Sequence, residues 1–139
     1  MDSRELRIGN YIQYCDMKAY KVVGFDDFGI DFDDEEVILS SGYEYFEPEP
    51  LTEEWLIKFG FKLLRKDEFN DYTQIVYGKS IIVGDEDNSE KLVIYFPFNK
   101  CEIGEYNPKD DDYSYVLNID IDYVHQVQNL FYSLTNTEL

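Results

Sequence analysis

The sequence has little positive charge, and none at all over one long stretch. Of its 139 residues, 12 are Lys or Arg and 30 are Asp or Glu, so the net charge at pH 7 is −18. No Lys or Arg lies between Lys21 and Lys58, whereas this stretch carries twelve carboxylates. A surface of this kind repels phosphate and attracts basic protein surfaces. The charge therefore argues against unaided binding of nucleic acid or of an anionic membrane.

Cysteines and long apolar runs are also scarce. The two cysteines, Cys15 and Cys101, lack the paired spacing of a zinc site or a redox dithiol, so we expect free, buried thiols. The first residues do not have the pattern of a secretory signal, and no run approaches the roughly 20 apolar residues that a membrane span needs. These features predict a protein of the cytoplasm.

Motifs of catalysis and of phosphate binding are missing too. The eight glycines are scattered singly, and basic residues do not cluster beyond Arg65 and Lys66. The single histidine, His125, has no G-x-S-x-G, cysteine-partner or H-E-x-x-H motif beside it. It stands one residue off an apolar helical stripe, which predicts a boundary residue rather than a catalytic one.

Two acidic segments place oxygen ligands at alternate positions, as calcium loops do. Neither supplies the turn glycine or the bidentate glutamate of an EF-hand, so we expect no dedicated metal site and no cofactor. The segments are Asp31-x-Asp33-x-Glu35 and Asp85-x-Asp87-x-Ser89.

Apolar residues are abundant in spite of the charge. They make up 44% of the chain and aromatic residues 17%, which suffices for one folded domain over residues 1–139. Short apolar runs separated by Asp, Gly and Ser predict an antiparallel, partly SH3-like meander in residues 6–46. Its expected strands are Tyr11–Tyr14, Tyr20–Phe25, Ile30–Phe32 and Val37–Leu39.

A mid-chain helix has the strongest local signals. It follows a stiff, extended link at residues 47–50. Thr52 can cap the first free amides, and Glu53 and Glu54 suit the positive end of the helix dipole. Gly60 is placed to end the helix.

The remainder of residues 51–139 predicts a second antiparallel sheet and a second helix. The sheet's expected strands are residues 61–64, 72–77, 81–83, 92–98 and 113–119. The helix is expected from Tyr123 to about Leu134, with Asp122 as its cap and Asn136 at its end. Its apolar stripe comprises Val124, Val127, Leu130, Phe131 and Leu134. The expected fold class is α+β, with antiparallel sheet and two packed helices, one mid-chain and one C-terminal.

Three segments together resemble a group of small proteins from Bacteroidetes and their phages and prophages, for which no activity is established. The segments are Glu5–Asn10 (ELRIGN), Leu51–Leu56 (LTEEWL) with Phe59–Phe61 (FGF), and Tyr123–Leu130 (YVHQVQNL). The resemblance brings no functional residues with it. It implies a prophage setting, which favours counter-defence proteins such as acidic inhibitors of CRISPR nucleases and restriction enzymes.

Taken together, these features predict a non-catalytic inhibitor that binds a basic protein surface. The expected partner is a host protein that handles nucleic acid, such as an RNA-guided nuclease, whose basic channel the acids would occupy. Two alternatives stay open: a phage or mobile-element accessory protein whose acidity serves only solubility, and an enzyme without a recognisable motif. The expected partner-binding residues are Asp26, Asp27, Asp31, Asp33, Asp34, Glu35, Glu36, Asp110, Asp111 and Asp112.

Four tyrosines lie beside acidic residues. They suit either the aromatic anchors of a protein interface or packing within a sheet. They are Tyr43, Tyr45, Tyr113 and Tyr115.

Overall fold

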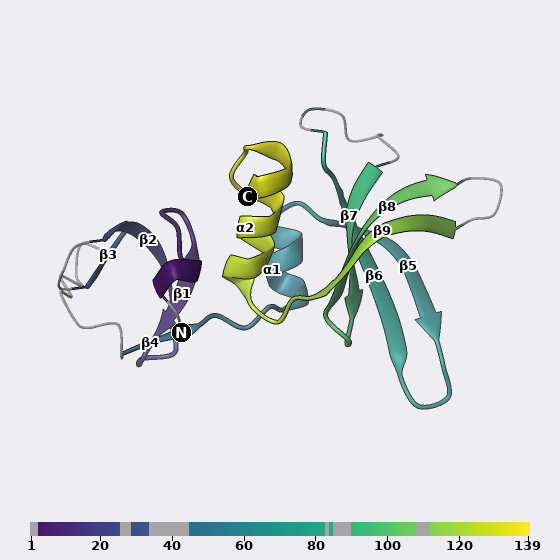
Figure 1. Ribbon diagram of the computed structural model, residues 1–139. Coiled ribbons are helices and arrows are strands. Elements are labelled where there is room, and N and C mark those ends of the chain that lie inside the picture. Colours follow the sequence, from purple (N-terminus) through teal and green to yellow (C-terminus); the bar gives the residue numbers. More distant parts are fainter. Residues whose placement is uncertain (1–2, 26–28, 34–44, 83, 85–89, 108–111) are drawn as a thin grey trace.

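The computed structural model of the protein describes residues 3–25, 29–33, 45–82, 84, 90–107 and 112–139, with the backbone alone in 105–107 and 112–117. An antiparallel sheet lies at each end of the molecule, and helices α1 (Glu53–Lys58) and α2 (Val124–Thr135) lie between the two sheets (Figure 1). The expected α+β class, with one mid-chain and one C-terminal helix, is confirmed. None of the described helices is long and apolar enough to cross a membrane.

The N-terminal sheet has the strand order β3-β2-β1-β4 and follows a short 3₁₀ helix, η1 (Ser3–Glu5). The three expected strands β1 to β3 are confirmed, and the expected strand at residues 37–39 lies outside the described residues. The extended link expected before α1 is wrong in part, because Glu47 and Pro48 belong to an edge strand paired with β1. Proline is tolerated on an edge strand, where one side of the backbone needs no partner. The strands are β1 (Tyr11–Tyr14), β2 (Ala19–Phe25), β3 (Ile30–Phe32) and β4 (Phe46–Pro48).

The second sheet is a meander in which each strand pairs with the next along the chain. The strand expected at residues 81–83 is wrong, since β6 ends at Ser80 and a bend follows. Strand β8 was not expected, because Cys101 and Ile103 alternate there with charged residues and Gly104, which leaves a weak apolar pattern. The strands are β5 (Lys62–Glu68), β6 (Thr73–Ser80), β7 (Glu90–Phe96), β8 (Lys100–Asn107) and β9 (Asp112–Asp120).

Helix α1 begins and ends as its sequence predicts. The Thr52 hydroxyl accepts a hydrogen bond from the Trp55 amide at 3.5 Å, and Glu53 and Glu54 occupy the first turn. Gly60 follows the C-cap with φ +79°, a left-handed conformation that glycine adopts without strain.

Helix α2 is capped differently from the prediction. Its N-cap is Tyr123 rather than Asp122. The Gln126 side-chain oxygen accepts hydrogen bonds from the amides of Asp122 at 2.9 Å and Tyr123 at 3.1 Å, so a residue in the first turn reaches back to the N-cap backbone, as in a capping box. The predicted C-terminal end is confirmed by Asn136, which has φ +54°.

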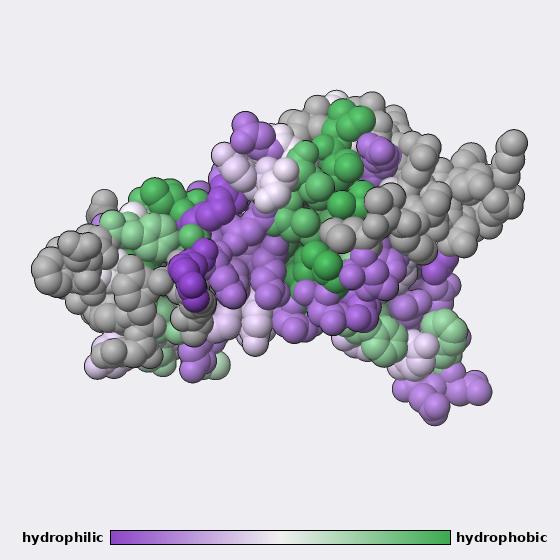
Figure 2. Space-filling view, viewed as in Figure 1, coloured by the Kyte–Doolittle hydropathy of each residue, from purple (hydrophilic) through white to green (hydrophobic). Residues whose placement is uncertain are grey.

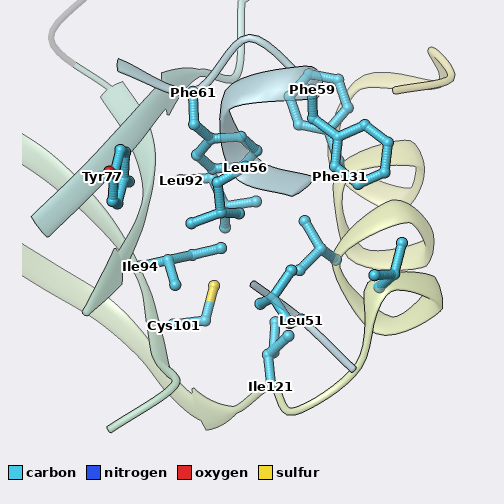
Figure 3. Close-up of a cluster of buried hydrophobic side chains, with 12 residues drawn as sticks. Leu51, Leu56, Phe59, Phe61, Tyr77, Leu92, Ile94, Cys101, Ile121 and Phe131 are labelled. Carbon is cyan, nitrogen blue, oxygen red and sulfur yellow. The ribbon is translucent and has the colours of Figure 1, made fainter. Parts of the chain in front are cut away.

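The main core lies between α1, α2 and the five-stranded sheet (Figure 3). Twelve of the described side chains are buried in it, and Leu56, Leu92 and Ile94 among them are 0% exposed. A smaller cluster belongs to the N-terminal sheet and has five buried members among the described residues. These are Leu6, Ile12, Val22, Ile30 and Phe46.

A buried polar network joins the N-terminal sheet to α2. Gln128, 0% exposed, accepts a hydrogen bond from the Tyr11 amide and donates one to the Gly9 carbonyl, each at 2.9 Å. Asn10, also 0% exposed, donates to Asn129 at 3.0 Å. Two of the three segments that carry the family resemblance therefore meet at this junction.

The predicted stripe of α2 is confirmed for Val124, Val127 and Phe131, which are buried, but the buried face is wider than predicted. It also includes His125 and Gln128, whereas Leu134 is 38% exposed. Helix α2 contacts both strand β1 and the main core. The side of the helix that faces β1 is therefore buried, as is the side that faces the main core.

Candidate functional site

Acidic residues gather on the N-terminal sheet and on the segment that leads into α1. Of the twelve carboxylates between Lys21 and Lys58, six belong to described residues, and we call these six the acidic end. The acidic end consists of Asp31, Asp33, Glu47, Glu49, Glu53 and Glu54.

Two of these carboxylates lie on and just after edge strand β3. Asp31 and Asp33 are both exposed. Asp31 pairs with Gly24 where the register of β2 and β3 shifts. A Cβ atom on Gly24 would lie 2.9 Å from the Asp31 Oδ2, so the missing side chain makes room for the carboxylate. The bulge and the glycine together let an acidic side chain occupy this edge.

Exposed apolar side chains accompany the acids. Val23 and Phe25, on β2, are 45% and 39% exposed, and Tyr45, directly before β4, is 50% exposed. Figure 2 shows apolar residues at the surface over this sheet and again in a band near the middle of the molecule. Aromatic side chains surrounded by polar ones are typical of protein interfaces. Of the other tyrosines singled out, Tyr43 lies outside the described residues, and Tyr113 and Tyr115 lie in β9, where the backbone alone is described.

Two members of the acidic end hold α1 in place instead of facing a partner. Glu49 accepts a hydrogen bond from the Trp55 indole at 3.0 Å, and Glu53 accepts one from the Tyr77 hydroxyl at 2.7 Å. The bond to Glu53, aided by burial, raises the pKa of Tyr77 to about 12. These two carboxylates are therefore structural, and Asp31, Asp33, Glu47 and Glu54 are left as the solvent-facing acids.

Elsewhere in the described chain, acidic and basic side chains form ion pairs with one another. Such pairs add little stability at a surface, but each neutralises charge locally. The stretch between Lys21 and Lys58 contains no basic residue that could neutralise its carboxylates, so the stretch itself carries a net negative charge. The pairs are Arg7–Glu138, Lys18–Asp16, Arg65–Asp67, Lys66–Glu68 and Lys100–Asp120.

The structure does not unite the ten predicted binding residues. Asp31 and Asp33 belong to the acidic end, whereas Asp112 begins β9 opposite Asn107. In Figure 1 the start of β9 and strand β3 lie at opposite ends of the molecule, so Asp112 cannot share one contact surface with the other two. The remaining seven lie outside the described residues: Asp26, Asp27, Asp34, Glu35, Glu36, Asp110 and Asp111.

The prediction that His125 is a boundary residue is wrong, because its side chain is 1% exposed. It lies against a shallow hollow of about 350 Å³ that Arg4, Glu5 and Arg7 help to line. Neither ring nitrogen has a hydrogen-bond partner among the described residues, and the Glu5 Oε2 is 3.8 Å from Nε2. Burial lowers the pKa of His125, although Glu5 acts in the opposite direction. The imidazole is therefore neutral at pH 7 and shielded from solvent.

The cysteines divide between two environments. Cys101 is buried, and burial, reinforced by the charge of Glu102, raises the pKa of its thiol to about 12. Cys15 is exposed, so the expectation of a buried thiol is wrong there, because this residue sits at the turn after β1. Within the described ranges, no group of three His, Cys, Asp or Glu side chains is arranged to hold a metal ion.

Comparison of the chain with protein-family models, with curated proteins and with solved structures gives no match. The resemblance to the Bacteroidetes and phage group therefore stays a prediction.

Proposed function

We propose that the protein acts without catalysis, by binding a basic protein surface through its acidic end. The observation that carries the proposal is the meeting of two features on the N-terminal sheet. Exposed carboxylates at Asp31, Asp33 and Glu47 occur in a stretch without any basic residue, and exposed Phe25 lies on the same sheet, with exposed Tyr45 directly before its strand β4.

The two kinds of side chain have different physical tasks in such an interface. Carboxylates create a long-range negative potential that speeds the approach of a basic partner, and this effect weakens as salt screens the charges. Aromatic side chains such as Phe25 and Tyr45 bury apolar area once contact is made and so slow dissociation. Together they allow association that is fast and also specific.

A nucleic-acid-handling protein is the partner class that we propose, with an RNA-guided nuclease of the host as one example. Duplex DNA carries one charge per about 1.7 Å of its axis, so twelve carboxylates match roughly 20 Å of duplex. A channel built for phosphates would attract this stretch for the same reason that it attracts nucleic acid. The resemblance to phage and prophage proteins supports a role in counter-defence.

The environment of His125 supports a non-catalytic role. A general acid or base must come within hydrogen-bonding distance of its substrate. A side chain that is 1% exposed does not offer its nitrogens to a dissolved substrate.

The test compares two variants that remove the same amount of charge. The first changes Asp31, Asp33 and Glu47 to Asn, Asn and Gln. The second, a control on the five-stranded sheet, changes Asp67, Glu68 and Asp120 to Asn, Gln and Asn. Association with purified RNA-guided nucleases and restriction enzymes is measured by biolayer interferometry at low and at physiological salt.

We expect the first variant to associate about tenfold more slowly at low salt and the control to associate like the original protein. Salt should reproduce the effect of the first variant. Equal binding of both variants without salt dependence would mean that the acidity serves only solubility.

A further inference from the structure

Three exposed aromatic side chains meet at one end of the five-stranded sheet, and we call them the aromatic tip. Phe69 and Tyr72 belong to the turn that joins β5 to β6, and Phe98 belongs to the turn that joins β7 to β8. The β5–β6 hairpin projects from the body of the molecule, at the end away from the N-terminal sheet (Figure 1). The aromatic tip is therefore separate from the acidic end.

The three rings contact one another. Phe69 stacks on Tyr72, with their ring centroids 4.7 Å apart and their planes inclined by 22°. The ring of Phe98 meets that of Tyr72 edge to face, at 5.1 Å between centroids. A hydrogen bond from the Phe69 amide to the Tyr72 carbonyl, at 2.9 Å, closes the first turn. Two separate hairpins thus hold the rings as one group.

In spite of these contacts, the rings stay open to solvent. Phe69 is 51% exposed, Tyr72 is 41% exposed and Phe98 is 48% exposed. None of the three belongs to a core cluster of the described residues. Single exposed apolar side chains are ordinary on a protein surface, whereas a contiguous group of them marks a contact site. Large exposed rings are also the side chains that anchor protein interfaces.

The charge around the aromatic tip is negative, because two exposed carboxylates there form no ion pair with another described residue. Asp71 lies in the β5–β6 turn itself. Asp122 lies beside the turn of Phe98, since it accepts a hydrogen bond from the Asn99 side chain at 3.5 Å. The lysines of the adjoining strands already pair with other acids and do not offset this charge. These pairs are Lys66–Glu68 and Lys100–Asp120.

Exposed rings and negative charge together select one kind of occupant. Nucleic acids stack their bases on aromatic rings where a basic groove holds the phosphates, and carboxylates repel phosphates instead. A second copy of this chain would bring the same negative charge to the contact, and an anionic membrane is repelled likewise. An arginine side chain fits both features, because its planar guanidinium stacks on an aromatic face and its N–H groups donate to carboxylates.

We propose that the aromatic tip docks an arginine-bearing segment of a protein partner. The guanidinium lies on an exposed face of a ring, and Asp71 and Asp122 attract its positive charge. The remaining ring surface covers the apolar carbons of the arginine side chain. This docking point does not depend on the partner proposed for the acidic end.

The test is an NMR titration with the capped peptide acetyl-Arg-Gly-Arg-amide at about 150 mM salt, where attraction between distant charges is screened. The amides of residues 69–72 should shift with a Kd of about 10 mM or lower. The corresponding lysine peptide should bind there at least about threefold more weakly, because an ammonium is a hydrated point charge that does not stack on a ring. The citrulline peptide, which keeps the shape of arginine without its charge, should shift none of these amides.

Two single substitutions separate the aromatic tip from the acidic end. Phe98→Ala removes one exposed ring and should weaken binding of the arginine peptide at residues 69–72 about threefold or more. The matched control is Phe25→Ala, which removes an exposed ring from the N-terminal sheet and should leave this binding unchanged. Thermal unfolding checks that both variants fold.

A further variant, Asp71→Asn, keeps every ring in place and should weaken binding of the arginine peptide about twofold, because it removes one of the two carboxylates. The proposal is overturned if residues 69–72 do not shift up to about 50 mM peptide, or if the arginine and lysine peptides bind there equally well. Undiminished binding to both the Phe98→Ala and the Asp71→Asn variants would overturn it as well.

Discussion

The two sheets are held in place by different forces. Among the described residues, the five-stranded sheet shares a cluster of twelve buried side chains with both helices, and the four-stranded sheet has a cluster of five. The smaller sheet adds ring contacts, such as Phe32 with Phe46 at 4.9 Å between centroids, and the hydrogen bonds of Gln128. Apolar burial therefore stabilises both sheets, and the N-terminal sheet is in addition fixed on α2 by the polar contacts of Gln128.

This contrast has a functional meaning. Concentrated like charge destabilises a folded surface, and a small core has little stability to offset it. In this molecule the exposed acids Asp31, Asp33 and Glu47 lie on or directly beside the smaller sheet, away from the main core (Figure 1). The arrangement separates the part that maintains the fold from the part that we propose to meet a partner.

The largest expected effect is from a cavity in the main core. Leu56 is 0% exposed, so Leu56→Ala should lower the free energy of unfolding by about 3 kcal/mol. Chemical denaturation followed by fluorescence and circular dichroism measures the loss. The control is Ile57→Ala on the same helix, where the side chain is 61% exposed and the expected change is under about 0.5 kcal/mol. Similar losses in the two variants would contradict the assignment of the main core.

A smaller effect, confined to one end, should follow from Gln128→Ala. The change leaves the buried Tyr11 amide and Gly9 carbonyl without their partner, at a cost of about 2 kcal/mol. Hydrogen exchange should speed up in β1 and β2 and stay slow in β6 and β7. The control, Ser133→Ala, removes an exposed hydroxyl from the same helix and should leave exchange unchanged. Equal acceleration in both sheets would show that they unfold as one unit.

The smallest expected effect is a pH dependence at the junction. Burial lowers the pKa of His125 in the folded state, so the unfolded chain takes up a proton first as the pH falls below about 6.5. The stability that His125 contributes is present above that pH and is lost as the pH falls through the folded-state pKa. His125→Gln should flatten thermal stability between about pH 5 and 7 without changing partner binding. An unchanged pH profile would show that the imidazole is not buried in neutral form.

The sequence was most informative where the signals are local. The cap at Thr52, the left-handed residues Gly60 and Asn136 and the alternation in β1 and β2 depend on near neighbours, and the structure confirms them. Strand β8 was missed because a strand between two others can form from a weak pattern when both neighbours bond to it. The burial of Gln128 on α2 was missed because it depends on β1, which lies more than a hundred residues earlier.

The candidate binding surface was likewise predicted only in part from the sequence. Of the acidic end, Asp31 and Asp33 were among the predicted binding residues, because they belong to an acidic run that is visible in the sequence, and both are exposed. The exposure of Phe25 was not singled out from the sequence, although it follows the alternation of β2, in which Tyr20 and Val22 are buried and Val23 and Phe25 are exposed.

The network of Asn10 and Gln128 also bears on the order in which the molecule assembles. The two residues are 118 positions apart, so β1 leaves the ribosome long before the helix on which it rests. Contacts of such long sequence separation form late, because a large loop must close first. The five-stranded meander, built from neighbouring strands, can pair as it emerges. We therefore expect the N-terminal sheet, made first, to reach its final place last.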